Sequence, residues 1–499
     1  MEKEQNKKAL NRNIKVISGV ILLLFVAIMA YMIYFQAFMA EEIAKKPGNV
    51  RYVVERNRVL RGPIYDRNGE VLSYSERQDD GKQKRIYQGG EAFAQILGYT
   101  RGTVVSGLEQ NMDDVLITDD FEFNIDKENL AEVLRDPSKA INRTKKGNSV
   151  VTTLDTQLQR KAYDLLGDTL GEKGSIVALD PKTGEILAMV NRPSYDPNKL
   201  DDTFEDLNKL NFDDGVFTNN AARGTYAPAS TFKIITLISA LENLEGVENR
   251  TFKDNGVLDV NVGQDLSNVD GNKYGDISLE TAFRVSSNVV FGGLAIELGA
   301  DKVGSVAERF GFNQVLKIKG FTITDSVFPS SIAQKDDGLI AAAGIGQGSV
   351  STQPLQMAMV AGAMANDGML LEPRLVRSIQ KYDGTTKETF DKKLYNTVAD
   401  VDIAQTVKSY MKNNVDASNN KTMKKLALIR GAGKTGTSQD TYTKTSEEKI
   451  DVNNSWFVGF APYEDPKIAI AVMGVDAGSG SGMAASIATE LMTWYVENR

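Results

Sequence analysis

An uncharged apolar run of 20 residues, Val16–Phe35, divides the chain into a short basic segment and a long remainder. As a helix, a run of this length can cross the hydrocarbon core of a membrane, which is about 30 Å thick. Five Lys and Arg residues precede the run, and Glu41 and Glu42 follow it, so the positive-inside rule places residues 1–15 in the cytoplasm. We therefore predict a single-pass anchor over residues 16–38 in the plasma membrane, with the rest of the chain outside the cytoplasm.

A cleaved signal peptide is the alternative explanation of this run. The apolar part of a signal peptide usually has about 7–15 residues, with small residues before the cleavage site. The run here is longer, and Phe38 would occupy the third position before a cut after Ala40. These features favour a retained anchor.

The composition excludes several kinds of site. The 499 residues contain no cysteine and no histidine, which rules out disulfides, a catalytic thiolate and a Ser-His-Asp triad. The usual transition-metal sites are not expected either. The net charge of −8 argues against binding nucleic acid through its phosphates. We therefore expect a globular protein of about two to four domains, without a metal or other cofactor and without a nucleic-acid partner.

A serine and a lysine three residues apart, Ser230 and Lys233, stand at the start of a predicted helix. Pro228 ends the preceding segment, and the apolar residues that follow Thr231 recur with helical spacing. Residues i and i+3 share one face of a helix, so the Lys233 amine would lie beside the Ser230 hydroxyl. A serine hydroxyl needs a nearby base to act as a nucleophile, and without histidine the lysine is the obvious candidate. On its own this spacing is a weak signal, because it also occurs by chance.

A second polar segment, Ser286–Asn288, lies within a helical pattern that covers residues 278–298. One interpretation is a simple interruption of the helix. The other is a second hydroxyl and an amide of the same site. In that case Ser286 would pass on a proton, and Asn288 would hold a backbone group of a peptide substrate. The residues alone leave both interpretations open.

A third segment, Lys434–Thr437, is interpreted as an exposed strand beside the site. Gly436 would leave this strand bare, so that an extended substrate could pair along it. Lys434 would supply positive charge, and the hydroxyls of Thr435 and Thr437 would bind a carboxylate.

The glycine-rich segment 344–348 lacks the pattern of a phosphate loop, and we expect it to let the backbone pass close to the site. Other patterns predict a buried sheet and a covering helix. They are a hairpin formed by 175–179 and 186–190, strands at 454–460 and 468–473, and a final helix over Met483–Val496. A turn at Asp66–Gly69 predicts a further hairpin, which could be no more than an ordinary hairpin with a charged tip.

Ser-x-x-Lys, Ser-x-Asn and Lys-Thr-Gly occur in this order at residues 230, 286 and 434. The set resembles the penicillin-binding protein and serine β-lactamase superfamily. Within it, the chain looks like a monofunctional (class B) penicillin-binding protein of the compact subgroup with a short pedestal. The supporting matches are Arg61–Gly69, Val177–Met189, Pro193–Asn198 and Trp456–Phe460. One departure is Ala229, where the family commonly has glycine; we expect it to alter the local turn without abolishing the chemistry.

The resemblance implies an α+β fold. Its transpeptidase domain would have a five-stranded antiparallel sheet flanked by helices, with an all-helical subdomain. A small pedestal domain and one N-terminal transmembrane helix would precede it. The implied domains are a cytoplasmic tail at 1–15, an anchor at 16–38, a pedestal or dimerisation-like domain at 39–150 and a transpeptidase domain at 151–499.

The resemblance also implies a peptidoglycan D,D-transpeptidase. Ser230 would attack the D-Ala-D-Ala bond of a stem peptide, release D-Ala and form an acyl-enzyme that an amine resolves. The further site residues it implies are Lys233 as base, Ser286 and Asn288, and then Lys434, Thr435, Gly436 and Thr437 on the substrate strand. β-Lactams would acylate the same serine, and a polytopic glycosyltransferase would be the membrane partner. A serine β-lactamase or a β-lactam sensor remains the alternative, and the motifs do not decide between transpeptidation and carboxypeptidation.

Overall fold

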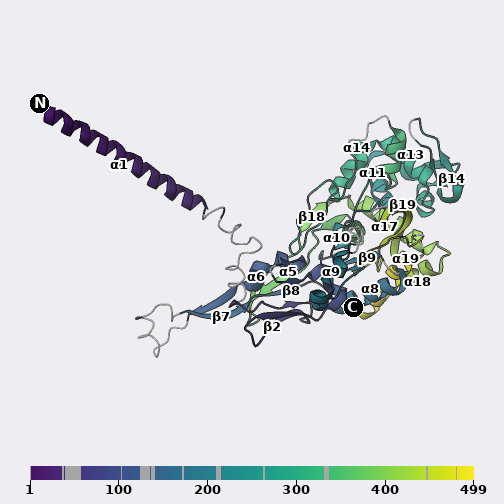
Figure 1. The fold of residues 1–499 in the computed structure, drawn as a ribbon. Coiled ribbons are helices and arrows are strands. Elements are labelled where there is room, and N and C mark those ends of the chain that lie inside the picture. The colour runs from purple at the N-terminus through teal and green to yellow at the C-terminus, as the bar shows by residue number, and fades with distance from the viewer. Residues whose placement is uncertain are drawn as a thin grey trace. The chain divides into compact units, whose positions relative to one another are not determined.

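The computed structural model describes residues 2–35, 39, 58–102, 104–123, 135, 141–170, 173–209, 215–261, 264–330, 336–445, 448–478, 480 and 482–499. The chain forms two compact units, residues 1–59 with 102–104 and residues 60–101 with 105–499, and these are described separately. Figure 1 follows the chain from purple at the N-terminus to yellow at the C-terminus.

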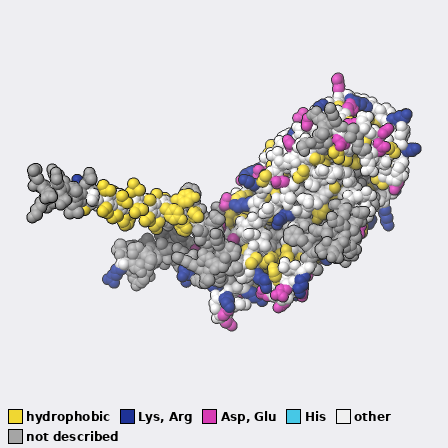
Figure 2. All heavy atoms as spheres, turned by 45° about the horizontal axis from the view of Figure 1, so that its top comes forward, with side chains coloured by type: hydrophobic (Ala, Val, Ile, Leu, Met, Phe, Trp, Pro, Cys, Tyr) yellow, Lys and Arg dark blue, Asp and Glu magenta, His cyan; other side chains and the backbone are white. Residues whose placement is uncertain are grey.

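The predicted apolar run lies in one helix, α1 (Glu2–Tyr34). Its segment Asn13–Tyr34 has 22 residues with a mean hydropathy of 2.8, and none of it is buried. Figure 2 shows apolar side chains along this helix. The segment is therefore long and apolar enough to cross a membrane. Residues 36–38 of the predicted anchor, and residues 40–57 of the predicted pedestal, lie outside the described residues.

The predicted five-stranded sheet is confirmed, in the order β10-β9-β21-β20-β19, and every neighbouring pair in it is antiparallel. Its strands are β9 (Gly174–Leu179), β10 (Ile186–Arg192), β19 (Ala432–Thr445), β20 (Glu448–Ala461) and β21 (Ile468–Gly474). The predicted hairpin of β9 and β10 is therefore correct, and β19 forms one edge of the sheet.

Both faces of this sheet are covered by helices, which explains why its strands are continuous apolar runs. Alternate residues of β21 belong to two different hydrophobic clusters. Ala469 and Ala471 pack in the cluster that contains α16 (Pro354–Ala365), whereas Ile470 and Val472 pack in the cluster that contains α19 (Met483–Asn498). Successive strand residues point to opposite faces, so α16 and α19 lie on opposite sides of the sheet. The predicted final helix is confirmed by α19.

The subdomain that follows the strand pair β9–β10 in sequence is mostly helical and not all-helical as predicted, because two short hairpins pair within it. Its helices include α11 (Lys233–Asn243), α12 (Leu279–Arg284), α13 (Asn288–Leu298), α14 (Ala300–Arg309), α15 (Asp337–Gly344), α17 (Val401–Asp416) and α18 (Lys421–Leu428). Two small hairpins lie among them, β11 (Thr251–Asp254) with β14 (Gly275–Ser278), and β12 (Val257–Leu258) with β13 (Leu266–Ser267).

The pedestal is built on a six-stranded sheet in the order β17-β16-β8-β1-β2-β3. The strands are β1 (Ile64–Tyr65), β2 (Val71–Arg77), β3 (Gln83–Tyr87), β8 (Ser149–Thr152), β16 (Val376–Gln380) and β17 (Thr386–Thr389). This sheet takes strands from both sides of residue 150, where we placed the boundary between pedestal and transpeptidase domain. The boundary itself stays a prediction.

Shorter elements complete the described chain. They are α4 (Ala94–Leu97), β4 (Thr100–Arg101), β5 (Val104–Val105), α5 (Gly107–Asn111), α6 (Asp113–Ile117), β6 (Asp119–Phe123), β7 (Ile141–Gly147), α8 (Thr156–Leu170), α9 (Leu200–Lys209), α10 (Asn220–Arg223), β15 (Met369–Leu371) and β18 (Leu394–Thr397).

The Asp66–Gly69 turn joins β1 to β2 as predicted, but its charged residues are not a solvent-exposed tip. Asp66 is buried and accepts hydrogen bonds from the backbone N–H groups of Asn68 (2.7 Å) and Glu70 (2.8 Å). Arg67 forms an ion pair with the buried carboxylate of Glu185 at 3.0 Å. The turn therefore attaches the pedestal to the loop between β9 and β10.

Candidate active site

Ser230 lies in a single 3-10 turn, Ala229–Thr231, directly before α11. The α-helix begins at Lys233, and the Ser230 side chain does not cap it, so the expected helix start at Ser230 is displaced by one turn. Ala229 has φ +52°, a left-handed conformation that costs a non-glycine residue about 1–2 kcal/mol. Its N–H donates to the carbonyl of Gly346 at 2.8 Å.

Gly346 shows why the segment 344–348 is rich in glycine. It has φ +74°, and a Cβ added to it would lie 2.3 Å from the carbonyl oxygen of Ala229. Only glycine allows this close approach. The prediction that this segment lets the backbone pass near the site is confirmed.

Lys233 is fully buried, and its amine contacts the second motif. The Nζ atom donates to the Ser286 carbonyl oxygen at 2.7 Å, to Asn288 Oδ1 at 2.7 Å and to Ser286 Oγ at 3.3 Å. The Ser230 hydroxyl is half-buried and has no hydrogen-bond partner among the described residues. Direct transfer of the Ser230 proton to Lys233 therefore stays a prediction.

The segment Ser286–Asn288 covers the break after α12 and the first residue of α13. Both interpretations of it therefore apply: the helix is interrupted, and the interruption carries site residues. Ser286 has φ +59°. Lys434 donates to Ser286 Oγ at 2.9 Å. Two lysine amines, from α11 and β19, therefore converge on one serine hydroxyl.

The third motif lies on edge strand β19, as predicted. Lys434 is buried and donates a further hydrogen bond to the Thr435 carbonyl at 3.0 Å. Thr435 is half-buried, whereas Thr437 is exposed and accepts a hydrogen bond from the Gly480 N–H at 3.0 Å.

Gly436 has a structural role that the sequence did not suggest. A Cβ added there would lie 3.1 Å from both the Pro228 carbonyl oxygen and Thr231 Cγ2. The glycine therefore lets the turn that carries Ser230 pack directly against β19.

Burial changes the protonation of both lysines. Burial lowers the pKa of Lys233 well below its usual value, the positive charge of Lys434 lowers it further, and the negative charge of Asp254 raises it. Burial also lowers the pKa of Lys434 to about 7. A neutral Lys233 can accept a proton, so the site can activate a hydroxyl without histidine.

Three residues behind the second motif were not identified from the sequence. They are Asp254, Asn268 and Ser287, which form buried hydrogen bonds beneath Ser286 and Asn288. In the sequence, Ser287 stands out only as the middle residue of Ser-x-Asn. No recognisable spacing links Asp254 or Asn268 to this motif.

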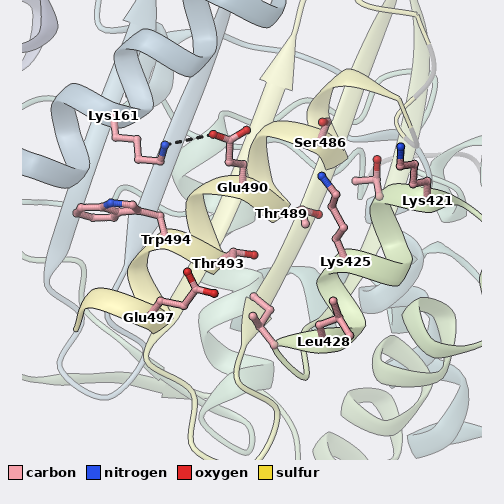
Figure 3. Close-up of a pocket in the computed structure, with 12 residues that line it drawn as sticks. Lys161, Lys421, Lys425, Leu428, Ser486, Thr489, Glu490, Thr493, Trp494 and Glu497 are labelled. Carbon is pink, nitrogen blue, oxygen red and sulfur yellow. Dashed lines mark hydrogen bonds and ion pairs between the residues drawn. The ribbon is translucent and has the colours of Figure 1, made fainter.

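A separate groove of about 600 Å³ lies between α18 and α19, and no motif residue lines it. Figure 3 shows Lys425 and Leu428 of α18 on one side and Thr489 and Thr493 of α19 on the other. Lys161 closes one end through an ion pair with Glu490 at 3.2 Å. The groove contributes nothing to the converging motifs.

Comparison with known proteins identifies two matching domain families. Residues 174–493 match the penicillin-binding protein transpeptidase domain, and residues 61–136 match the penicillin-binding protein A dimerisation domain. The chain is 30% identical to the peptidoglycan D,D-transpeptidase PbpA of Mycolicibacterium smegmatis, over 96% of this chain and 97% of that protein.

Solved structures agree with these matches. The D,D-transpeptidase domain of a peptidoglycan glycosyltransferase from Eggerthella lenta has a TM-score of 0.74 and 32% identity, covering 88% of this chain and 99% of that one. Penicillin-binding protein A of M. tuberculosis, solved as a ceftriaxone acyl-enzyme, has a TM-score of 0.77 and 26% identity, covering 89% and 100%. That protein has also been solved as a penicillin G acyl-enzyme.

Proposed function

Because the chain belongs to the penicillin-binding protein transpeptidase family, we propose that Ser230 is the nucleophile of a peptidoglycan D,D-transpeptidase. The observation that carries this assignment is the convergence of the Lys233 and Lys434 amines on Ser286 Oγ. Lys233 begins α11, three residues after Ser230. Relatives over nearly the whole chain are named peptidoglycan D,D-transpeptidases, and neighbouring structures are β-lactam acyl-enzymes.

The reaction begins when Ser230 Oγ attacks the carbonyl carbon of the penultimate D-Ala of a stem peptide. Neutral Lys233 takes the hydroxyl proton, and the carbonyl oxygen gains the electron pair of the breaking π bond. Backbone N–H groups of Ser230 and Thr437 hold this oxyanion, a contribution typically worth about 3–4 kcal/mol per donor. When the peptide bond breaks, the Ser286 hydroxyl passes the proton to the leaving amine of D-Ala.

A neighbouring stem peptide then supplies the amine that resolves the Ser230 ester and forms the cross-link. Strand β19 would align the donor peptide, with Thr435 and Thr437 binding its carboxylate. Gly436 is buried and packs against the turn that carries Ser230, so the expectation that it leaves the strand bare is replaced by this close packing. Asn288 would hold the substrate amide and the Lys233 amine together, since its Oδ1 already accepts from Lys233. The proposed domains are the predicted ones, with the pedestal at 39–150 and the transpeptidase domain at 151–499.

Covalent labelling tests the nucleophile. Ser230→Ala should abolish labelling by a fluorescent penicillin, because it removes the hydroxyl that would form the acyl ester. Ser486→Ala, which removes an exposed hydroxyl on α19, should label as the wild type does. Labelling of the Ser230→Ala protein at wild-type level would overturn the assignment.

Product analysis separates the related activities. With lipid-linked glycan strands and a glycosyltransferase, a transpeptidase gives cross-linked dimers that mass spectrometry detects. A carboxypeptidase gives only shortened stem peptides. A serine β-lactamase would release hydrolysed penicillin within seconds, whereas a transpeptidase keeps its acyl-enzyme.

For the anchor, we infer a cytoplasmic N-terminus, because five basic residues precede the apolar run. The chain has no cysteine, so a single introduced thiol reports its own location. A membrane-impermeant maleimide should label Ser486→Cys in intact spheroplasts and should label Asn6→Cys only after lysis. The reverse pattern would overturn the orientation.

For the partner, we infer a polytopic glycosyltransferase that contacts the anchor and the pedestal. The resemblance to monofunctional penicillin-binding proteins supports this partnership. Tagged protein from gently solubilised membranes should co-purify such an enzyme, and exchange of residues 16–38 for an unrelated transmembrane helix should weaken the association. Recovery of the tagged chain without any glycosyltransferase would count against it.

A further inference from the structure

Asp254 is a buried carboxylate beneath the second motif, at the end of strand β11. It is 0% exposed and accepts four hydrogen bonds. The donors are Ser287 Oγ to Oδ2 at 2.6 Å, Asn268 Nδ2 to Oδ1 at 2.8 Å and to Oδ2 at 3.0 Å, and the Gly256 N–H to Oδ1 at 2.9 Å. No lysine or arginine forms an ion pair with this carboxylate in the described part of the chain, so its partners there are these neutral donors.

The groups that donate to Asp254 also hold the first turn of α13. Asn268 Oδ1 accepts from the backbone N–H groups of Asn288 (2.7 Å) and Val289 (3.2 Å). Ser287 Oγ accepts from the N–H of Val290 at 3.0 Å. The first three N–H groups of α13, which have no partner within the helix, are therefore all satisfied by side chains bound to Asp254.

This network fixes both functional residues of the motif. The Asn288 Nδ2 donates to the Ser267 carbonyl at 2.8 Å, which leaves Oδ1 directed at the Lys233 amine. The left-handed backbone of Ser286, unfavourable for a serine, places both its carbonyl and its hydroxyl at Lys233. Such a conformation persists only where the surroundings hold it.

We propose that Asp254 is the positioning residue of this site: through Ser287 and Asn268 it holds Ser286 and Asn288 against Lys233, and it supplies the buried negative charge that balances the two lysines. This role deepens the proposed function and rests on it. Lys233 must both accept and return a proton, and an amine whose pKa is too low is a poor proton acceptor. A carboxylate behind the motif keeps Lys233 a usable base.

The charged groups around Lys233 determine the sign of the expected effect. Lys434 on β19 favours neutral Lys233, and Asp254 on β11 favours protonated Lys233. Tyr274 is the other titratable group influenced by Asp254; burial and then the charge of Asp254 raise its pKa, so it is neutral in the working range. Removal of the Asp254 charge should therefore let Lys233 lose its proton at lower pH.

The test measures the second-order rate of penicillin acylation against pH in the full-length, detergent-solubilised protein. The acid limb of this profile is the part in which the rate rises with pH as Lys233 loses its proton. For Asp254→Asn we expect this limb to move to lower pH by about 1 unit, with a plateau rate about tenfold lower. Asp270→Asn is the matched control, since it removes one exposed charge from the same segment, and asparagine tolerates its left-handed backbone. Its profile should match that of the wild type.

A purely structural role would change the amount of active protein without moving the acid limb. An acid limb at the wild-type position in Asp254→Asn would therefore overturn the proposal, whatever the plateau rate. Absence of any wild-type acylation at Ser230 would instead refute the proposed function.

A second pair of variants covers the case in which Asp254→Asn does not fold. Ser287→Ala removes a donor to Asp254 and the cap of α13, and we expect acylation to slow about tenfold. Ser287→Thr retains the hydroxyl and should recover most of the rate. Equal rates for the alanine variant and the wild type would overturn the positioning role.

Discussion

Lys233 and Lys434 perform their roles because they are buried next to each other. In an exposed position each amine would carry a proton at neutral pH, but burial removes much of the solvation that stabilises that charge. The pKa of Lys434 is lowered to about 7, so even this residue is only partly charged at neutral pH. The expectation that Lys434 simply supplies positive charge therefore holds fully only in mildly acidic solution.

Removal of the Lys434 charge should have the opposite effect to removal of the Asp254 charge. In Lys434→Met, Lys233 keeps its proton to higher pH, so the acid limb of the acylation profile should move to higher pH. The plateau rate should also fall, because Ser286 loses one donor. Lys425→Met, which removes an exposed lysine from α18, is the control. A shift to lower pH would contradict the electrostatic description of the site.

At the level of single residues, the sequence identified the side chains that carry reactive groups but not the side chains that keep them in position. Ser230, Lys233, Ser286 and Lys434 stand in recognisable short spacings. Asp254 reaches the site only because β11 pairs with β14 and ends beneath α13. That proximity depends on tertiary packing, which no local pattern records.

Among the elements, β19 packs closely against the turn before α11. Gly436 is the point of contact, because Pro228 and Thr231 lie 3.1 Å from the position that a Cβ would take, which is closer than ordinary van der Waals contact. The sequence correctly predicted a strand at Lys434–Thr437 and a helix after Ser230. Their mutual approach was not predictable, because the two elements are far apart in the sequence and meet only through the tertiary packing of one shared hydrophobic cluster.

Gly436→Ala should displace the turn that carries Ser230. The added methyl group must push apart two backbone segments by a few tenths of an ångström, and we expect penicillin acylation to slow by about tenfold or more. Thermal stability should change little. Gly293→Ala on α13, where a Cβ would meet only Leu258 at 3.9 Å, should acylate normally. Unchanged acylation by Gly436→Ala would show that this contact does not position Ser230.

At the scale of the folded domains, the buried carboxylate of Glu185 is one of the contacts between the pedestal and the transpeptidase region. Glu185 forms ion pairs with Arg67 of the pedestal turn at 3.0 Å and with Arg374, just before β16, at 2.8 Å. Removing one partner of a buried ion group leaves the other charges uncompensated, which costs about 3–5 kcal/mol when burial is complete. The arginines here are partly exposed, so the cost is smaller.

Glu185→Ala should lower the free energy of unfolding by about 2 kcal/mol and the melting temperature by several degrees, measured by intrinsic fluorescence. Acylation per folded molecule should stay at the wild-type rate, because no motif residue contacts Glu185. Glu388→Ala removes one partner of an exposed pair with Lys319 at 3.8 Å and should melt as the wild type does. Equal melting temperatures for the two variants would contradict the role of Glu185 in stabilising the contact between the pedestal and the transpeptidase region.

The pedestal sheet also has a consequence for the order of biosynthesis. Strand β8 pairs with β16 through Val150 and Ile379, so the sheet cannot be completed until roughly 230 further residues have been synthesised, and pairings this distant in sequence form slowly. Until then β8 presents an unpaired edge, the kind of surface that joins to other chains. We expect ribosome-bound chains that end before β16 to be the aggregation-prone and protease-sensitive species in the life of this protein.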